Sequence, residues 1–164
     1  MAVAIIDLQE RLVPAIGNGE DMVAAARKLA AGARILGQQV CFTEQNPDKL
    51  GGTVNGFELG SELPISKLAF DSSRLLPEEP EEWILAGCEA HICIRQTAHG
   101  LLEAGKRVII AVDAVGSRKP IDKETALRQL QRAGAELSTV EAILFKWLGG
   151  ADHPEFRQVS KLIK

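Results

Sequence analysis

Short apolar runs alternate along the chain with longer segments of helical periodicity. The runs cover residues 2–6, 40–44, 63–67, 83–87, 107–113 and 135–139, and their length is typical of buried strands. Apolar residues recur at helical spacing over 21–39, and we predict further helices over 92–105, 121–134, 140–149 and 153–164. Asp71 is expected to cap a short helix over 71–76, and Asp122 to cap the helix over 121–134.

This order of elements predicts an α/β protein with a parallel sheet covered by helices on both faces. No linker, repeat or low-complexity segment interrupts residues 1–164, so we expect a single domain. The predicted architecture is a Rossmann-like three-layer sandwich with six parallel strands in the order 3-2-1-4-5-6. The stretch from Gln45 to Leu63 is rich in Gly, Asn and Pro and predicts a long loop.

Composition removes several classes of function. The net charge of −3 and the absence of Tyr argue against nucleic acid as a partner. No apolar run approaches the length of a membrane helix, and the N-terminus lacks the basic region of a signal peptide. We therefore expect a cytoplasmic protein that has no membrane partner. Three cysteines, an odd number, fit reduced thiols better than a disulfide framework.

Candidate chemistry gathers where the predicted strands end. In such a sheet, ligands bind beyond the carboxyl ends of the strands, where Asp7, Lys67 and Cys93 are expected to meet. Cys93 falls in the first turn of a predicted helix, and the helix dipole and the Lys67 ammonium would both lower its pKa. Asp7 could accept the thiol proton and return it, and N–H groups around Ile92 and Cys93 could form an oxyanion hole.

Other interpretations of the cysteines remain open at this stage. Cys41 lies inside a strand and is expected to be a core residue, and Cys88 and Cys93 could also serve only in packing. Cys88, His91 and Cys93 read C-x-x-H-x-C, but zinc needs a fourth ligand, so we predict neither a metal nor a cofactor. A thiol-redox role would require Cys88 and Cys93 to pair across the strand-to-helix turn.

Three segments, "VAIIDLQERLVP", "PISKLAF" and "GCEAHICIRQTAHGLLEAGKRVIIAVDAVGSR", resemble the isochorismatase-like cysteine hydrolases. The likeness covers nearly the whole chain, and the C-terminal part is similar to the isochorismatase-domain-containing subgroup. The resemblance implies a catalytic triad of Asp7, Lys67 and the nucleophile Cys93, and a cis peptide bond near Cys88–Glu89. It also implies a homo-oligomer that hydrolyses a small amide or related acyl compound through a thioacyl intermediate.

Residues 41–56 contain no His, so the metal site of nicotinamidases is not expected. A non-catalytic binding or scaffold oligomer that retains the triad is the alternative function. We expect a turn fixed by a pair between Asp113 and Arg118. The residues expected to line a small-molecule pocket are Gln9, Glu44, Gln45, Phe70 and His91.

Overall fold

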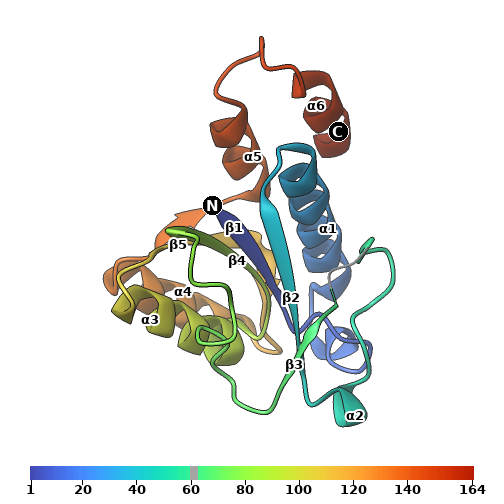
Figure 1. Cartoon of the computed structure of the whole chain (residues 1–164). Helices are drawn as coiled ribbons and strands as arrows, with labels where there is room; N and C mark the ends of the chain where they lie inside the picture. Colours follow the sequence, from blue (N-terminus) through green and yellow to red (C-terminus); the bar gives the residue numbers. More distant parts are fainter. Residues whose placement is uncertain (60–62) are drawn as a thin grey trace.

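The computed structural model describes residues 1–59 and 63–164 and contains a six-stranded sheet in the order β3-β2-β1-β4-β5-β6 (Figure 1). Every neighbouring pair of strands is parallel. The predicted fold class and strand order are therefore confirmed. The strands are β1 (Ala2–Ile6), β2 (Gln39–Gln45), β3 (Ile65–Lys67), β4 (Glu82–Cys88), β5 (Arg107–Gly116) and β6 (Glu136–Ser138).

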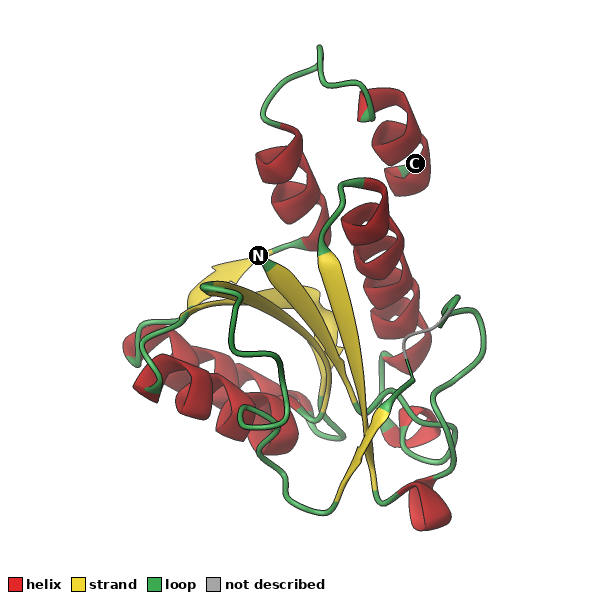
Figure 2. Cartoon of the chain, in the orientation of Figure 1, coloured by secondary structure: helices red, strands yellow, loops and turns green. Residues whose placement is uncertain are grey.

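Helices cover both faces of the sheet, as Figure 2 shows. One layer holds α1, α5 and α6, and the opposite layer holds α3 and α4 (Figure 1). A π-helical turn, η2, precedes α3. The helical elements are η1 (Val13–Ala15), α1 (Gly19–Ile35), α2 (Pro47–Leu50), η2 (Ala90–Ile94), α3 (Arg95–Glu103), α4 (Pro120–Arg132), α5 (Val140–Leu148) and α6 (Phe156–Ile163).

Strand β1 shows how the sheet separates two cores. Val3 and Ile5 point into the core shared with α1, α5 and α6, whereas Ala2, Ala4 and Ile6 point into the core shared with α3 and α4. Successive side chains of a strand face opposite sides, so a strand that is covered twice must be apolar throughout. This explains why residues 2–6 lack any polar alternation.

Two local predictions are wrong. Residues 71–76 form a turn and no helix, because Asp71 accepts hydrogen bonds from both the backbone N–H and the hydroxyl of Ser73. Helix α4 begins at Pro120 with Lys119 as its N-cap, so Asp122 lies inside the first turn. Proline suits the first position of a helix because its missing N–H would have no intrahelical partner.

The predicted loop from Gln45 to Leu63 contains structure that its composition did not indicate. It holds the short helix α2, and Thr53 forms an antiparallel bridge with Gln9. Residues 60–62 of this stretch lie outside the described residues. Across the part of the chain that the structure describes, no helix combines the length and apolarity needed to cross a bilayer.

Candidate active site

The carboxyl edge of the sheet brings together the three residues that the sequence singled out. Asp7 follows β1, Lys67 ends β3, and Cys93 lies in η2 just after β4. The Lys67 Nζ lies 2.7 Å from Asp7 Oδ2, and both side chains are buried. Asp7 adopts a positive φ of 53° at the point where the chain leaves the strand. Two opposite charges in contact and shielded from water form a strong local electrostatic pair.

Two side chains at the end of β2 form hydrogen bonds with the members of this ion pair. The Thr43 hydroxyl donates to Asp7 Oδ1 at 2.7 Å, and Lys67 Nζ donates to Gln45 Oε1 at 2.7 Å. Gln45, which was expected to line a pocket, positions Lys67 with its side chain. Thr43 was missed, although parallel pairing places it beside Ile6, the residue before Asp7.

The Cys93 thiol is buried beside this pair, with 5% of the residue exposed. Burial raises its pKa most, Asp7 adds to the increase through its charge and a hydrogen bond, and Lys67 lowers it, so that the net pKa is about 12. The predicted direction for Lys67 is therefore right, but the predicted net direction is wrong. A buried site disfavours the thiolate more than one cation and a helix terminus favour it. The resting group is a neutral thiol.

The turn that carries Cys93 depends on Gly87. A Cβ at this position would lie 1.9 Å from the backbone oxygen of Ile6, and the φ of Gly87 is +119°. Only glycine therefore allows β4 to approach β1 so closely here. The next peptide bond, Cys88–Glu89, is cis, which is the position that the resemblance implied.

The surroundings of Cys88 argue against a role as a nucleophile. Its thiol is fully buried and donates to the backbone oxygen of Asp7 at 3.2 Å. Burial, and then the charge of Asp7, raise its pKa well above the ordinary value. All three cysteines of the chain are buried and none forms a disulfide.

Polar side chains fix the turn η2 to the end of β5. Glu89 is buried and accepts hydrogen bonds from the backbone N–H and the guanidinium of Arg118 at 2.9–3.1 Å. His91 Nδ1 lies 3.0 Å from Ser117 Oγ. Arg118 therefore pairs with Glu89, and the predicted pair between Arg118 and Asp113 is wrong. The Asp113 carboxylate instead accepts from the backbone N–H of Val140.

Two residues expected in the pocket serve the loop that follows β2. The Gln9 amide donates to the backbone oxygens of Gln45 and Gly51, and the Glu44 carboxylate accepts from the N–H and hydroxyl of Thr53. Both side chains thus hold the segment that borders Lys67. Phe70 is 48% exposed, so it lies on the surface three residues beyond Lys67.

Metal-ligating side chains do not cluster in the described part of the chain. Within residues 1–59 and 63–164 no three His, Cys, Asp or Glu side chains come close enough to hold a metal ion. His91 already contacts Ser117, and Cys88 already donates to the backbone of Asp7. The arrangement is therefore that of a buried thiol, a carboxylate and an ammonium on a doubly wound sheet.

These features define an α/β protein with a cysteine-centred site at the carboxyl edge of its sheet. Residues 1–142 match the family model of the isochorismatase domain, and the chain belongs to that family. It is 38% identical to isochorismatase domain-containing protein 1 of Salmo salar over 96% of this chain. It is 36% identical to isochorismatase domain-containing protein 2 of Homo sapiens, with 98% of this chain and 81% of the relative covered. The chain spans 59% of the length of the Salmo salar protein.

Solved structures show the same fold. A structure described as MAR1 ribonuclease from Caenorhabditis elegans is 39% identical, has a TM-score of 0.92, and is matched over 99% of this chain and 88% of that chain. A cysteine hydrolase from Pseudomonas syringae is 15% identical with a TM-score of 0.76, over 98% of this chain and 92% of that chain. At that identity the second likeness concerns the fold alone.

Proposed function

We propose that this protein is a cysteine hydrolase that cleaves a small amide or related acyl compound through a thioacyl-enzyme intermediate. The observation that carries the proposal is the buried Asp7–Lys67 pair with the Cys93 thiol against it. A buried thiol that served only packing would not need an ion pair, since burying two charges costs several kcal/mol of desolvation.

Acylation begins with the neutral thiol. As the Cys93 Sγ forms a bond to the substrate carbonyl carbon, its proton passes to the Asp7 carboxylate. This coupled transfer suits a pKa near 12, because free thiolate is scarce at neutral pH. The carbonyl oxygen becomes an oxyanion, and Asp7 then gives its proton to the leaving nitrogen as the C–N bond breaks. The amine departs and the acyl group remains on sulfur.

Deacylation reverses the same proton path. A water molecule attacks the thioester carbon and gives its proton to Asp7, the C–S bond breaks, and Asp7 returns the proton to sulfur. Lys67, held by Gln45, donates a hydrogen bond to Asp7 and favours negative charge on sulfur. The backbone N–H of Cys93 is the oxyanion donor that we propose. The N–H of Ile92 already donates to the Glu89 oxygen at 3.0 Å.

The burial of the three site residues favours a small substrate. Asp7 is fully buried, and Lys67 and Cys93 are each 5% exposed, so little of the site's surface is open to a substrate. RNA is the other substrate class to test, because structures 39% and 31% identical to this chain carry the description MAR1 ribonuclease, the second as a putative one. The net charge of −3 gives no attraction to phosphate groups.

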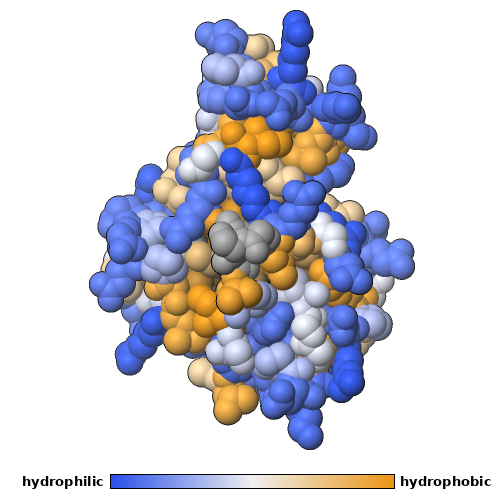
Figure 3. All heavy atoms as spheres, turned by 45° about the vertical axis from the view of Figure 1, so that its right-hand side comes forward, coloured by the Kyte–Doolittle hydropathy of each residue, from blue (hydrophilic) through white to orange (hydrophobic). Residues whose placement is uncertain are grey.

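Homo-oligomerisation forms part of the same proposal. Apolar side chains reach the surface beside β3, and Figure 3 shows apolar areas among a largely hydrophilic surface. A structural relative from Escherichia coli is described as an octameric hydrolase. Light scattering tests this part, and a monomer would contradict it. The exposed residues are Leu63, Leu68 and Phe70, which flank β3 along the chain, and Leu75 in the turn that follows.

Burst kinetics test the proposed chemistry. With p-nitrophenyl acetate, the wild-type protein should release p-nitrophenolate in a burst matching the protein concentration, followed by slower turnover. Cys93→Ala should abolish the burst. Cys41→Ala is the matched control, because Cys41 is also buried but lies in β2 outside the site. The same proteins are then assayed against small amides and against RNA.

The alternative functions predict different results. A binding or scaffold oligomer gives no burst in any variant, and this would contradict the proposal. A redox protein gives a reversible Cys88–Cys93 disulfide in non-reducing peptide mapping, which would also contradict it. Cleavage of RNA that survives Cys93→Ala would place the activity at another site.

A further inference from the structure

Four residues at the carboxyl edge of the sheet are joined in a closed ring of hydrogen bonds. Lys67 Nζ donates to Asp7 Oδ2 at 2.7 Å and to Gln45 Oε1 at 2.7 Å. The backbone N–H of Gln45 donates to Gln9 Oε1 at 2.8 Å, and the backbone N–H of Gln9 donates to the backbone oxygen of Asp7 at 3.0 Å. The ring therefore joins the ends of β1, β2 and β3 around the ion pair.

Both side-chain donors of Gln9 are in use within the protein. The residue is completely buried, and its amide nitrogen donates to the backbone oxygens of Gln45 and Gly51 at 3.1 and 2.7 Å. A primary amide has two N–H donors and one acceptor oxygen, and that oxygen already accepts from Gln45. Gln9, which was expected to line a pocket, thereby holds both backbone polar groups of Gln45.

The N–H groups of the Lys67 ammonium divide among three partners. An ammonium carries three donors and no acceptor. Asp7 and Gln45 take two of these donors. The remaining donor is left for the Cys93 sulfur, because Lys67 lowers the pKa of this thiol through its charge and a hydrogen bond. The two oxygen acceptors therefore set the rotation of the ammonium and the direction of its third N–H.

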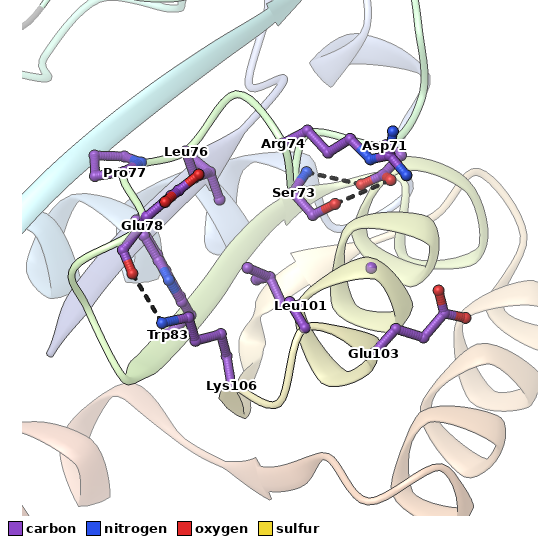
Figure 4. A pocket seen from close by; sticks show the side chains of 12 residues that line it. Asp71, Ser73, Arg74, Leu76, Pro77, Glu78, Trp83, Leu101, Glu103 and Lys106 are labelled. Carbon is purple, nitrogen blue, oxygen red and sulfur yellow. Dashed lines mark hydrogen bonds between the residues drawn. The ribbon is translucent and has the colours of Figure 1, made fainter.

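The strand that carries Lys67 is a short edge strand. It has three residues, and in the described part of the chain it pairs with β2 alone. Just beyond it, Gln45 Nε2 donates to the backbone oxygen of Leu68 at 2.7 Å. Further along, in the turn shown in Figure 4, the Asp71 carboxylate accepts from the N–H and hydroxyl of Ser73. The Gln45 side chain therefore supports Lys67 both at its ammonium and at the backbone of the next residue.

We propose that Gln9 is a positioning residue that acts on Cys93 without touching the substrate. It holds Gln45, and Gln45 orients the Lys67 ammonium toward the sulfur. Without this orientation the thiol ionises less readily, because its favourable contact with the cation is weakened. This role rests on Cys93 being the proposed nucleophile, but the reactivity of the thiol is measured without turnover. A failure of the positioning role is therefore distinguishable from a failure of hydrolysis.

Alkylation by iodoacetamide at a fixed pH measures this reactivity in matched variants. Gln9→Met removes the amide that holds Gln45 and should slow the alkylation of Cys93 at least about fivefold, as expected for one weakened hydrogen bond. Thr53→Val is the control, because its hydroxyl donates to Glu44 in the same loop but outside the ring, so its rate should match that of the wild type. A wild-type or faster rate in Gln9→Met would overturn the proposal, and so would an equal loss in Thr53→Val.

A double variant tests whether Gln9 acts through Gln45. Gln45→Met alone should slow alkylation by at least as much as Gln9→Met, and the double variant should be no slower than Gln45→Met. Independent effects, which multiply in the double variant, would overturn the proposal. An effect that arises only from easier access to the buried thiol would persist in the Gln45→Met background, so this comparison separates access from orientation.

The burst with p-nitrophenyl acetate separates positioning from substrate contact. In Gln9→Met the limiting burst rate should fall at least about fivefold, whereas the ester concentration that gives half of this rate should change less than about twofold. A change in the half-saturating concentration alone would show that Gln9 contacts the substrate and would overturn its positioning role. Wild-type protein that gives no burst would instead contradict the proposed hydrolysis.

Hydrogen exchange tests the ring in the wild-type protein, without any substitution. The backbone N–H groups of Gln9 and Gln45 should exchange at least about a hundredfold more slowly than in an unstructured peptide, because both donate within the ring. Exchange of either group at the unprotected rate would overturn the proposal, even if Gln9→Met failed to fold.

Discussion

Two buried carboxylates at opposite edges of the sheet have different surroundings. Asp7, at the carboxyl edge, is held by the buried Lys67 ammonium and by the Thr43 hydroxyl. Glu82, at the amino edge, meets only the exposed guanidinium of Arg107 through one oxygen, and its Oε1 has no partner among the described residues. Burying a charge among fixed partners costs desolvation free energy. A protein that keeps such a buried pair therefore has a functional reason for it. Arg107, by contrast, is 75% exposed, so water screens the charge of its pair with Glu82.

Removing the cation from each pair should give the largest contrast. Lys67→Met leaves Asp7 buried without its counter-ion and should lower the free energy of unfolding by about 3–5 kcal/mol. Arg107→Met removes a side chain that is 75% exposed and should cost no more than about 1 kcal/mol. Urea denaturation of both variants at neutral pH measures the difference. Equal losses would show that the two edges do not differ in this way.

Glycine substitution tests how closely the strands approach at the carboxyl edge. Gly87→Ala places a Cβ 1.9 Å from the Ile6 oxygen and should destabilise by at least about 3 kcal/mol. Gly134→Ala is the control, since its φ of +105° is similar but no atom lies within 4 Å of the added Cβ. It should cost about 1 kcal/mol through backbone strain alone. Thermal unfolding separates the two, and a mild Gly87 variant would contradict the close approach.

Removal of one hydroxyl should have a smaller effect. Thr43→Val keeps the shape of the side chain and deletes the 2.7 Å hydrogen bond to Asp7. Because this removes one hydrogen bond from a buried carboxylate, we expect a loss of about 1–3 kcal/mol. Ser72→Ala is the matched control, because its buried hydroxyl has no partner among the described residues and should cost less. If both variants lose the same stability, the hydrogen bond is unimportant.

The alkylation profile of Cys93 should show no inflection in the accessible pH range. With a pKa of about 12, the iodoacetamide rate should rise about tenfold per pH unit from pH 7 to 10. Lys67→Met removes the cation that lowers this pKa, so alkylation at a fixed pH should become slower. Peptide mapping by mass spectrometry gives the rates. A plateau near pH 8.5, the pKa of an ordinary thiol, would contradict the burial of this sulfur.

The sequence predicted the fold well because its signals are local. Apolar runs and helix-ending glycines placed the elements, and the alternation of strands and helices gave the sheet order. The meeting of Asp7, Lys67 and Cys93 followed from that topology. The roles of Thr43 and Gln45 could not be predicted in this way, because they depend on which side chains of the neighbouring strands lie next to them.

The direction in which the pKa of Cys93 is shifted could not be predicted from the sequence either. The helix start and Lys67 are visible in the chain, and both favour the thiolate. The depth at which the thiol is buried depends on packing between β1, β4 and η2, and desolvation outweighs both favourable terms. Asp113 and Arg118 likewise found separate partners, because β5 and η2 bring Glu89 beside the arginine.

The most direct test of the proposed chemistry is the site of acylation. The protein is mixed with p-nitrophenyl acetate, quenched in acid during the burst, digested and mapped by mass spectrometry. The proposal predicts one acetyl group, on Cys93, with far slower labelling in Asp7→Asn and normal labelling in Cys41→Ala. Acetylation spread over surface lysines with Cys93 unmodified, or equal labelling of Cys93 in Asp7→Asn, would contradict it.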